Sequence, residues 1–537
     1  MSASRKGSGP PASGSGRARK KIADAGYGSA SRNRPPVEVG QTVVCDIAGL
    51  THEGEGVGRV EGYTLFVSGA LPGEKVRAEV VKVGKSFGKA VMRELVARSA
   101  ERREARCPIY ESCGGCQLQH LDYAAQLKWK RRYVADCLVR IGKLPVAEAN
   151  GGGLAAEADD GGLAAGGSGG GAGSGIETGL DGGHKRRPIV VHETIGMDDP
   201  WRYRNKAQVP IGRGEAGLIG GFFEEGSHEI VDMEACLIQQ TENEETVRAV
   251  KEAARLLGIS GYDRATGRGL LRHVVVRHAR ATGQRMVVLV TNGRDIPRAD
   301  ELVALIRERV PGVTSIAQNV NTARTPVVFG EETRTLWGED FIYDEIGGIR
   351  FAISARSFFQ VNPEQTERLY RKAVEYAGLT GEETVVDAYC GIGTISLFLA
   401  RHARRVYGVE IVPEAVEDAR RNAALNGIRN AEFVVGRAEK VMPEWQRSGL
   451  RPDVIVVDPP RKGCDPALIN AMLNMRPARI VYVSCNPSTL ARDLRLLEDG
   501  GYLTAKVQPV DMFPHTGHVE CCVLMVKNTK SQNPRIP

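Results

Sequence analysis

Three polar signatures between Asp458 and Glu520 limit the possible folds most strongly, because each follows a short apolar run. The signatures are Asp458-Pro459-Pro460-Arg461, Ser484-Cys485-Asn486-Pro487 and His518-Val519-Glu520. Residues 454–457 and 480–483 have the composition of buried strands, and a less regular run precedes Met512. Reactive residues of an open α/β sheet collect at the carboxyl ends of its strands. We therefore predict one sheet edge that presents an acid, a thiol and a second carboxylate, which is a nucleophile with proton acceptors.

The length and composition of the chain favour a multidomain protein. Its 537 residues suffice for several cores, and 42% hydrophobic with 26% charged residues is ordinary for soluble proteins. No apolar run is long enough to span a bilayer, and the N-terminus lacks the apolar segment of a secretory signal. Because the eleven cysteines are unevenly scattered, we expect free thiols rather than a disulfide framework. We expect a cytoplasmic monomer without membrane contact.

The net charge of +7 comes from one short segment. Residues 1–36 hold eight Lys and Arg against one Asp, a net charge of +7, so the rest of the chain is about neutral. The segment is rich in Gly, Ser and Pro, and we expect a disordered basic arm. It could hold RNA phosphates loosely, act as a solubilising tail or be a transit peptide.

Residues 37–97 have the pattern of a small β-barrel. Four runs of strand composition alternate with turn residues, which fits a five-stranded barrel of the OB kind. The sequences Gly-Leu-Thr-His-Glu-Gly-Glu-Gly-Val-Gly at 49–58 and Leu-Pro-Gly-Glu at 71–74 resemble a TRAM domain. That resemblance implies RNA binding.

A cysteine set opens the next region, residues 98–355, which we expect to be a central α+β domain. Cys107, Cys113 and Cys116 lie close together, and Cys236 is the candidate fourth ligand. Four cysteines bind either zinc or an iron–sulfur cluster. The three-plus-one spacing favours a [4Fe–4S] cluster and leaves zinc, or no metal, open. A Gly/Ala-rich stretch at 146–184 is expected to be a flexible insertion.

Two further segments of this region combine positive charge with other features. Residues 126–139 form an amphipathic helix that bears Lys128, Lys130, Arg131 and Arg132, either as a basic patch or as an ordinary solvated face. Residues 201–206, Trp-Arg-Tyr-Arg-Asn-Lys, interleave aromatic rings with cations. That pattern suits contact with RNA phosphates and bases, or equally a surface strand of mixed polarity.

Residues 356–537 contain a cofactor signature. A strand at Thr384–Ala388 ends near Asp387, a turn with Gly391 and Gly393 leads into a helix, and a second strand ends in Glu410. Glycines allow close approach of the ligand, and the second acid binds ribose hydroxyls. The absence of a third helix glycine argues against a pyrophosphate, so S-adenosylmethionine fits better than NAD. Cys390 reads as a wall residue of this site.

Cys485 carries the chemistry that the edge predicts. Carbon 5 of uracil is a poor nucleophile until a thiolate attacks carbon 6, and a base must later remove the carbon-5 proton. We expect the helix that begins after Pro487 to lower the pKa of Cys485. Cys464 is the rival nucleophile. The loop at Asp458 also resembles that of amine-methylating enzymes, but Arg461 replaces their stacking aromatic residue.

These motifs together resemble the RNA (uracil-5-)-methyltransferase family, over roughly residues 37–527 apart from the Gly/Ala stretch. The resemblance implies a Rossmann-like class I methyltransferase domain with Cys485 as nucleophile and Glu520 as base. It implies S-adenosylmethionine contacts from Gln360, Tyr389, Glu410 and Asp458. It also implies a [4Fe–4S] cluster on Cys107, Cys113, Cys116 and Cys236.

The implied substrate is a uridine in RNA. The cluster and the TRAM domain favour the 23S rRNA branch of the family over the tRNA branch. The target base has to be flipped out of the folded RNA, and Phe358 or Phe359 could stack on it. An amine-directed nucleic-acid methyltransferase, or an RNA-binding or redox-sensing protein with a vestigial methyltransferase domain, are the alternatives.

Overall fold

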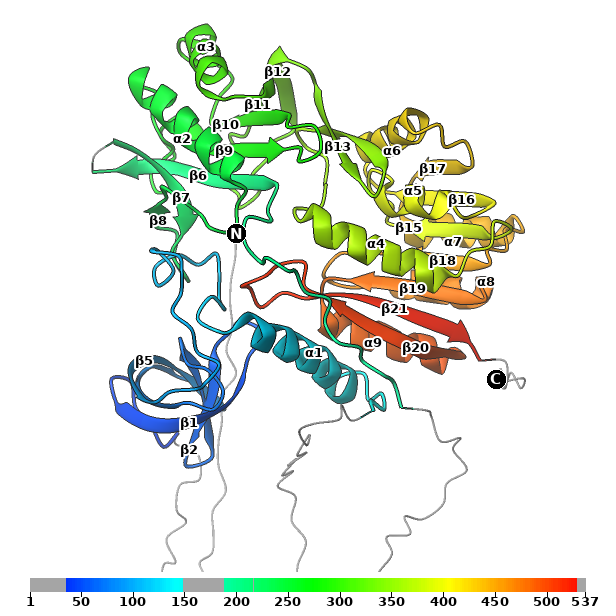
Figure 1. Ribbon diagram of the computed structural model, residues 1–537, viewed down its shortest axis with the longest axis horizontal. Coiled ribbons are helices and arrows are strands. Elements are labelled where there is room, and N and C mark those ends of the chain that lie inside the picture. Colours follow the sequence, from blue (N-terminus) through cyan, green and yellow to red (C-terminus); the bar gives the residue numbers. More distant parts are fainter. Residues whose placement is uncertain (1–34, 148–187, 216, 529–537) are drawn as a thin grey trace, which may run out of the picture.

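Figure 1 shows the computed structural model of the chain, which describes residues 35–147, 188–215 and 217–528. The expected basic arm at 1–36 and the expected insertion at 146–184 lie almost entirely outside these residues. None of the helices in the described part of the chain combines the length and the apolar character needed to cross a membrane.

The first domain is a closed five-stranded barrel, as expected. Its strands are β1 (Thr42–Leu50), β2 (Gly56–Val60), β3 (Tyr63–Ser68), β4 (Lys75–Val83) and β5 (Phe87–Ala97), in the order β1-β2-β3-β5-β4. Burial alternates along β1, so Val43, Cys45 and Ile47 point into the barrel. Closure leaves no free sheet edge.

A seven-stranded sheet forms the second layered unit. Its strands are β6 (Lys206–Gly214), β7 (Gly217–Phe223), β8 (Ile230–Asp232), β9 (Leu271–His278), β10 (Arg285–Thr291), β11 (Val313–Val320) and β12 (Glu332–Gly338). They lie in the order β12-β11-β10-β9-β6-β7-β8. Helices α2 (Thr241–Leu256) and α3 (Ala299–Arg309) cover one face over a shared apolar core (Figure 1). This unit has the mixed helix and strand content expected of the central domain.

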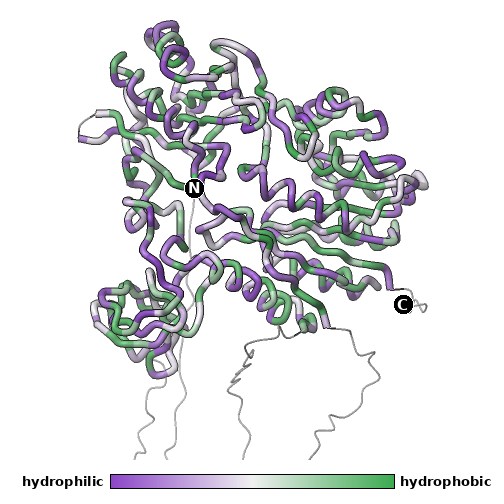
Figure 2. Tube along the Cα trace, in the orientation of Figure 1, coloured by the Kyte–Doolittle hydropathy of each residue, from purple (hydrophilic) through white to green (hydrophobic). Residues whose placement is uncertain are grey.

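The C-terminal unit is a doubly wound sheet in the order β17-β16-β15-β18-β19-β21-β20. The strands are β15 (Thr384–Ala388), β16 (Arg405–Glu410), β17 (Ala431–Val435), β18 (Val454–Val457), β19 (Arg479–Ser484), β20 (Tyr502–Val510) and β21 (Glu520–Lys527). The helices are α4 (Pro363–Ala377), α5 (Thr394–Ala400), α6 (Pro413–Leu425), α7 (Ala438–Arg447), α8 (Pro466–Met475) and α9 (Pro487–Asp499). Strands β15 and β18 are buried throughout, because helices cover both faces. Figure 2 shows that the strands of this sheet are largely apolar, whereas its helices carry both polar and apolar residues.

The strand order of this sheet reverses direction at β15. From β15 the chain moves outward to β16 and β17, then returns to β18 on the other side of β15. The carboxyl ends of β15 and β18 therefore meet at a topological switch point, where open α/β sheets bind ligands. Strand β21 is antiparallel to both of its neighbours, β19 and β20.

Two elements from the range 98–355 pack against the C-terminal sheet. Helix α1 (Tyr123–Arg140) lies along α9 and β20 and shares their apolar core (Figure 1). The hairpin of β13 (Phe341–Ile346) and β14 (Ile349–Ser354) buries its apolar side in the core on the other face of the sheet. These contacts tie the central region to the sheet that carries the candidate site.

Candidate active site

Three chain segments bring Asp458, Cys485 and Glu520 to one edge of the C-terminal sheet. Asp458 follows β18, and Cys485 follows β19. Glu520 arrives differently from the expectation, because it is the first residue of the antiparallel strand β21 and does not follow a strand end. Ser484 pairs with Cys521 in the β19–β21 register, so Cys485 and Glu520 are the next residues along the two strands. The antiparallel strand thus starts where the parallel strand ends.

The N-terminus of α9 holds the Asp-Pro-Pro-Arg loop beside Cys485. Asn486 caps the helix by accepting a hydrogen bond from the Ser488 amide at 3.0 Å, and Pro487 occupies its first turn. Two side chains of the same turn, Asn486 Nδ2 and Thr489 Oγ1, each donate to the carbonyl of Arg461 at 3.1 Å. The cap therefore fixes both the thiol-bearing residue and the loop that follows Asp458.

The electrostatics of the edge oppose a thiolate in the free protein. Burial, followed by the charges of Glu520 and Asp458, raises the pKa of Cys485 to about 11, and Arg461 acts in the opposite direction. The net pKa of Cys485 in the protein without ligands is therefore raised, which is opposite to the direction expected from the start of α9 alone. The Cys485 thiol is half-buried near two acidic side chains. Desolvation and charge repulsion therefore raise its pKa by more than a helix terminus lowers it.

The carboxyl groups at this edge also hold their protons more tightly than usual. Burial and the nearby Asp458 raise the pKa of Glu520 to about 8, against the opposing effect of Arg461. Burial raises the pKa of Asp458 to about 6. A base with a pKa near neutrality is suited to removing a proton from carbon.

Cys464 and Cys390 are placed as structural thiols. The amide of Cys464 donates to Asp493 Oδ2 at 2.8 Å, and its side chain is buried in the core beneath α9. Burial raises the pKa of Cys464 to about 12. Cys390 is 4% exposed, in agreement with its expected role as a wall residue.

The switch point has the features of a cofactor site. Tyr389 (φ +70°) and Gly391 (φ +54°) turn the chain sharply after β15, and a Cβ on Gly391 would meet only open space. Glu410 ends β16 and accepts from the amides of Gly391 and Val412 at 3.2 and 3.0 Å. Asp387 Oδ1 is buried without a partner among the described residues. An unused carboxylate oxygen, open space and an acid at the second strand together fit an adenosyl ligand.

The loop before α4 carries Gln360 and Phe358. The Gln360 carbonyl accepts from Asn205 Nδ2 at 3.1 Å, which binds the loop to the central domain. Phe359 packs in the core with its ring centroid 5.7 Å from that of Phe351. Phe358 is 71% exposed. Of the two rings, Phe358 is therefore the one available for contact with a substrate.

The four cysteines line a single cavity of about 370 Å³. None of the four cysteines forms a disulfide. Burial raises the pKa of Cys236 to about 12, and the charges of Cys116 and Cys113 add to this shift. Within the described residues, no group of three or more His, Cys, Asp or Glu side chains is close enough to hold a metal ion. The same cavity is lined by Arg461 from the loop after Asp458 and by His518 from the segment before Glu520.

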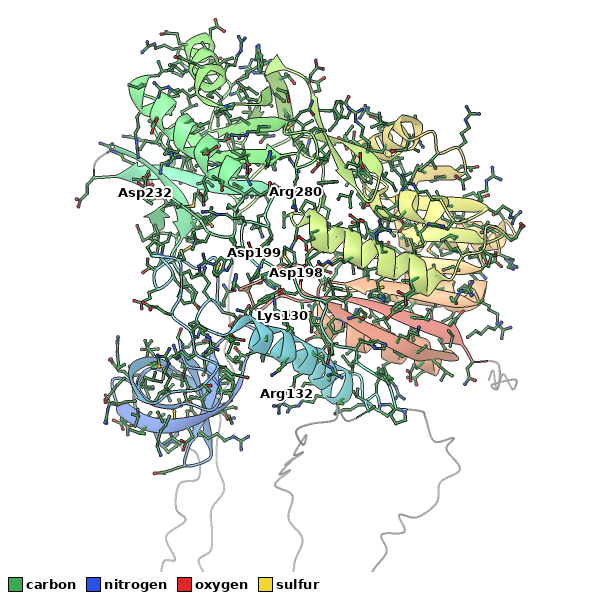
Figure 3. The ribbon with its side chains drawn as sticks, in the orientation of Figure 1. Lys130, Arg132, Asp198, Asp199, Asp232 and Arg280 are labelled. Atoms are coloured by element: carbon green, nitrogen blue, oxygen red, sulfur yellow. The ribbon has the colours of Figure 1, made fainter. Side chains whose placement is uncertain are left out.

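The connection between β20 and β21, residues 511–519, is held from several sides, and the sequence patterns did not reveal this. Lys130 of α1 is fully buried and donates to Asp511 Oδ1 at 2.5 Å and to the Phe513 carbonyl at 3.1 Å. Figure 3 shows Lys130 on the side of α1 toward this connection and Arg132 on the opposite side. A Cβ at Gly517 would lie 2.1 Å from the His52 carbonyl of the barrel, so only glycine fits there. The segment that ends in Glu520 is therefore positioned by α1 and by the barrel.

Comparison with known proteins agrees with this geometry. The tRNA (uracil-5-)-methyltransferase family model matches residues 332–528, and the TRAM domain model matches residues 36–92. A protein named as an uncharacterized RNA methyltransferase of Halalkalibacterium halodurans is 54% identical over 499 residues, which are 93% of this chain and 100% of that protein. A relative of the same description from Listeria monocytogenes is 48% identical over 488 residues, 91% of this chain and 98% of its own length.

One solved structure resembles almost the entire chain. It is the Pyrococcus abyssi tRNA (uracil-54, C5)-methyltransferase in complex with S-adenosyl-L-homocysteine, with a TM-score of 0.67 and 28% sequence identity. The similarity covers 90% of this chain and 100% of that one.

The fold and the site define a class I, S-adenosylmethionine-dependent RNA methyltransferase with an N-terminal TRAM barrel. Within this class, the chain belongs to the RNA (uracil-5-)-methyltransferase family.

Proposed function

We propose that the protein methylates carbon 5 of a uridine in 23S rRNA through a covalent bond between Cys485 and the base. The observation that supports this most is the β19–β21 register, which sets a thiol beside a carboxyl group at the end of the cofactor crevice. A thiol and a base are the two groups that carbon-5 methylation needs. In this proposal Gln360, Tyr389, Glu410 and Asp458 contact the cofactor.

The steps of the reaction follow from these groups. The Cys485 thiol first loses its proton to solvent. The thiolate sulfur then bonds to carbon 6 of uracil, and the electrons of the 5,6 double bond move to the carbon-4 oxygen as an enolate. S-adenosylmethionine, when bound, supplies an electrophilic methyl group on a sulfonium sulfur. Carbon 5 takes this methyl group and the carbon–sulfur bond electrons remain on the departing sulfide. Glu520 in its ionised form then removes the carbon-5 proton, the double bond forms again, and the Cys485 thiolate leaves.

A mechanism-based substrate tests the nucleophile. RNA with 5-fluorouridine has no carbon-5 proton to lose, so the adduct should persist on a denaturing gel after incubation with S-adenosylmethionine. We expect Cys485→Ala to give no adduct, and Cys464→Ala, a buried thiol of the same domain, to give one. Full methyl transfer to ordinary RNA by Cys485→Ala would instead support the amine-directed reaction at the Asp458 loop.

The choice between rRNA and tRNA needs its own experiment. The TRAM barrel and the cysteine-lined cavity support 23S rRNA, whereas the tRNA substrate in the name of the Pyrococcus abyssi protein supports tRNA. Methyl transfer should be measured side by side on unmodified transcripts of 23S rRNA and of tRNA. We expect incorporation into 23S rRNA, and transfer to tRNA alone would assign the second substrate.

We further propose that Cys107, Cys113, Cys116 and Cys236 hold a [4Fe–4S] cluster. Four free thiols around one cavity are the donor set that such a cluster uses. It would join the 107–116 loop to the loop of Cys236, and its role would be structural because methyl transfer needs no electrons. Protein purified without oxygen should be brown and contain iron, and Cys116→Ser should lose both properties. Stoichiometric zinc in the wild type would contradict the proposal.

A further inference from the structure

The segment at 201–206 uses its aromatic residues inside the protein. The Trp201 ring stacks on His515 with centroids 3.9 Å apart, and the Arg106 guanidinium lies 4.8 Å from the Trp201 centroid. Tyr203 is buried and donates to the Pro514 carbonyl at 3.2 Å. These rings cannot stack on RNA bases, so any RNA contact of this segment has to come from its cations.

Three cations of this region lie together. Lys206 faces Arg277 directly in the antiparallel register of β6 and β9, an arrangement of like charges that destabilises a sheet. Burial, and then the charges of Arg277 and Arg204, lower the pKa of Lys206 to about 7. Within the described residues, none of the three has a carboxylate oxygen within 4.0 Å, and none of the groups that shift the pKa of Lys206 is a carboxylate. Among the described residues, the cluster Arg204–Lys206–Arg277 thus has an excess of positive charge that no carboxylate within 4.0 Å compensates, although Arg204 also faces the thiol of Cys116.

This cation cluster lies beside the candidate active site. Arg277 is buried and donates to the carbonyls of Ala355 and Ser357, in the loop that leads to Phe358. Between the two other cations, the Asn205 amide donates to the Val361 carbonyl at 2.8 Å. Arg204 lines the cavity that Arg461 and His518 also line. The charge is therefore concentrated where the central sheet meets the catalytic loops.

An anion that binds here would relieve the cost of the unpaired charges. Partly buried cations without counter-ions weaken the fold, and an incoming anion compensates them. RNA carries such an anion at every nucleotide, and Lys and Arg contacts to phosphates provide most of the sequence-independent affinity. We propose that Arg204 and Lys206 bind a backbone phosphate of the substrate RNA next to the target uridine, with Arg277 adding charge and holding the Phe358 loop. This proposal rests on the RNA methyltransferase function and names one contact that the substrate makes.

The test removes one charge and keeps the packing. In Lys206→Met the side chain still contacts the Phe329 ring, whose centroid lies 5.9 Å from Nζ in the wild type. Binding of the full-length protein to transcripts of 23S rRNA and of tRNA should be measured without cofactor at several salt concentrations. We expect affinity to fall about tenfold for both, and the slope of log K against log salt to become less steep by about one. Lys206→Arg should retain the wild-type slope.

The control is the same change at a lysine that has a counter-ion. Lys372 on α4 lies 2.5 Å from Glu375, so Lys372→Met should leave the salt slope unchanged. Lys206→Met should unfold at the same temperature as the wild type or higher, because it relieves like-charge repulsion. An unchanged slope in a folded Lys206→Met protein would overturn the proposal.

The cofactor carboxylate is the other possible anion. If Lys206→Met weakens S-adenosylmethionine binding in calorimetry and leaves the RNA slope unchanged, the cluster serves the cofactor and our proposal is wrong. RNA binding is measured here without methyl transfer. A missing 5-fluorouridine adduct in the wild type would therefore contradict the proposed function separately from this result.

Discussion

Lys130 and Asp511 form an ion pair with 2.5 Å between Nζ and Oδ1, and neither side chain is exposed. Tyr123 donates to the second oxygen of Asp511 at 2.9 Å, so both carboxylate oxygens have partners. The pair connects α1 to the segment that ends in Glu520. A surface helix of the expected kind would leave that segment without this support.

Breaking this pair on one side should destabilise the protein strongly. We expect Lys130→Met or Asp511→Asn to lower the free energy of unfolding by about 3–5 kcal/mol, because the remaining charge is buried and unpaired. The double variant should lose less unfolding free energy than the two single variants together. Denaturant unfolding of the wild type, the two single variants and the double variant measures these free energies. Additive losses would show that the two side chains act independently. Lys128→Met, at an exposed position of the same helix, is the control.

Replacing the proposed base should stop the reaction after methyl transfer. In Glu520→Gln the carbon-5 proton has no acceptor, so the Cys485 thiolate cannot leave. We expect ordinary, unsubstituted RNA to stay bound covalently to this variant on denaturing gels, with turnover reduced at least about a hundredfold. If the variant turns over normally and no adduct accumulates, another group is the base.

The raised pKa of Glu520 should also appear in stability. The folded protein keeps a proton on Glu520 up to a pH of about 8, whereas an unfolded glutamate releases it near 4.5. The folded state therefore binds more protons across this window, and its stability falls as the pH rises through it. Relative to the wild type, Glu520→Gln should gain roughly 4 kcal/mol of unfolding free energy between pH 5 and pH 9. Urea unfolding at the two pH values checks this, and an equal difference at both would contradict the shift.

The exposed ring of Phe358 should contribute to substrate binding without supporting the fold. Its side chain is 71% exposed, so Phe358→Ala should unfold at nearly the wild-type temperature. Stacking on a base contributes about 1–3 kcal/mol, so we expect kcat/KM to fall roughly tenfold or more. Phe358→Tyr should restore it. Unchanged kinetics in Phe358→Ala would remove this ring from the site, and the buried Phe359 provides the contrast, since Phe359→Ala should lose stability.

Much of the fold could be predicted from the chain because its signals are local. The apolar runs before Asp458 and Cys485 have the length and branching of buried strands, and Asn486-Pro487 is a helix start in any context. The closed barrel and the position of Asp387 at the end of β15 follow from the same short-range patterns.

Other features escaped prediction because they depend on partners far along the chain. Lys130 lies in a basic run, and no nearby residue indicates that it forms an ion pair with Asp511, 381 positions later in the chain. Trp201 and Tyr203 have the pattern of an RNA-binding segment, yet both contact residues inside the protein. Trp201 stacks on His515, and Tyr203 donates a hydrogen bond to the Pro514 carbonyl. In each case a side chain that is polar or aromatic by type is buried by a distant segment.

The sequence by itself determined the chemical groups of this methyltransferase and the ends of the elements that present them, because strand, cap and turn preferences act over a few residues. Only the tertiary structure decided that Glu520 enters at the start of an antiparallel strand, that four cysteines share one cavity, and that the Cys485 thiol holds its proton in the free protein. Those properties depend on how deeply each group is buried and on which charges from distant segments lie near it. Both are defined only once the chain has folded.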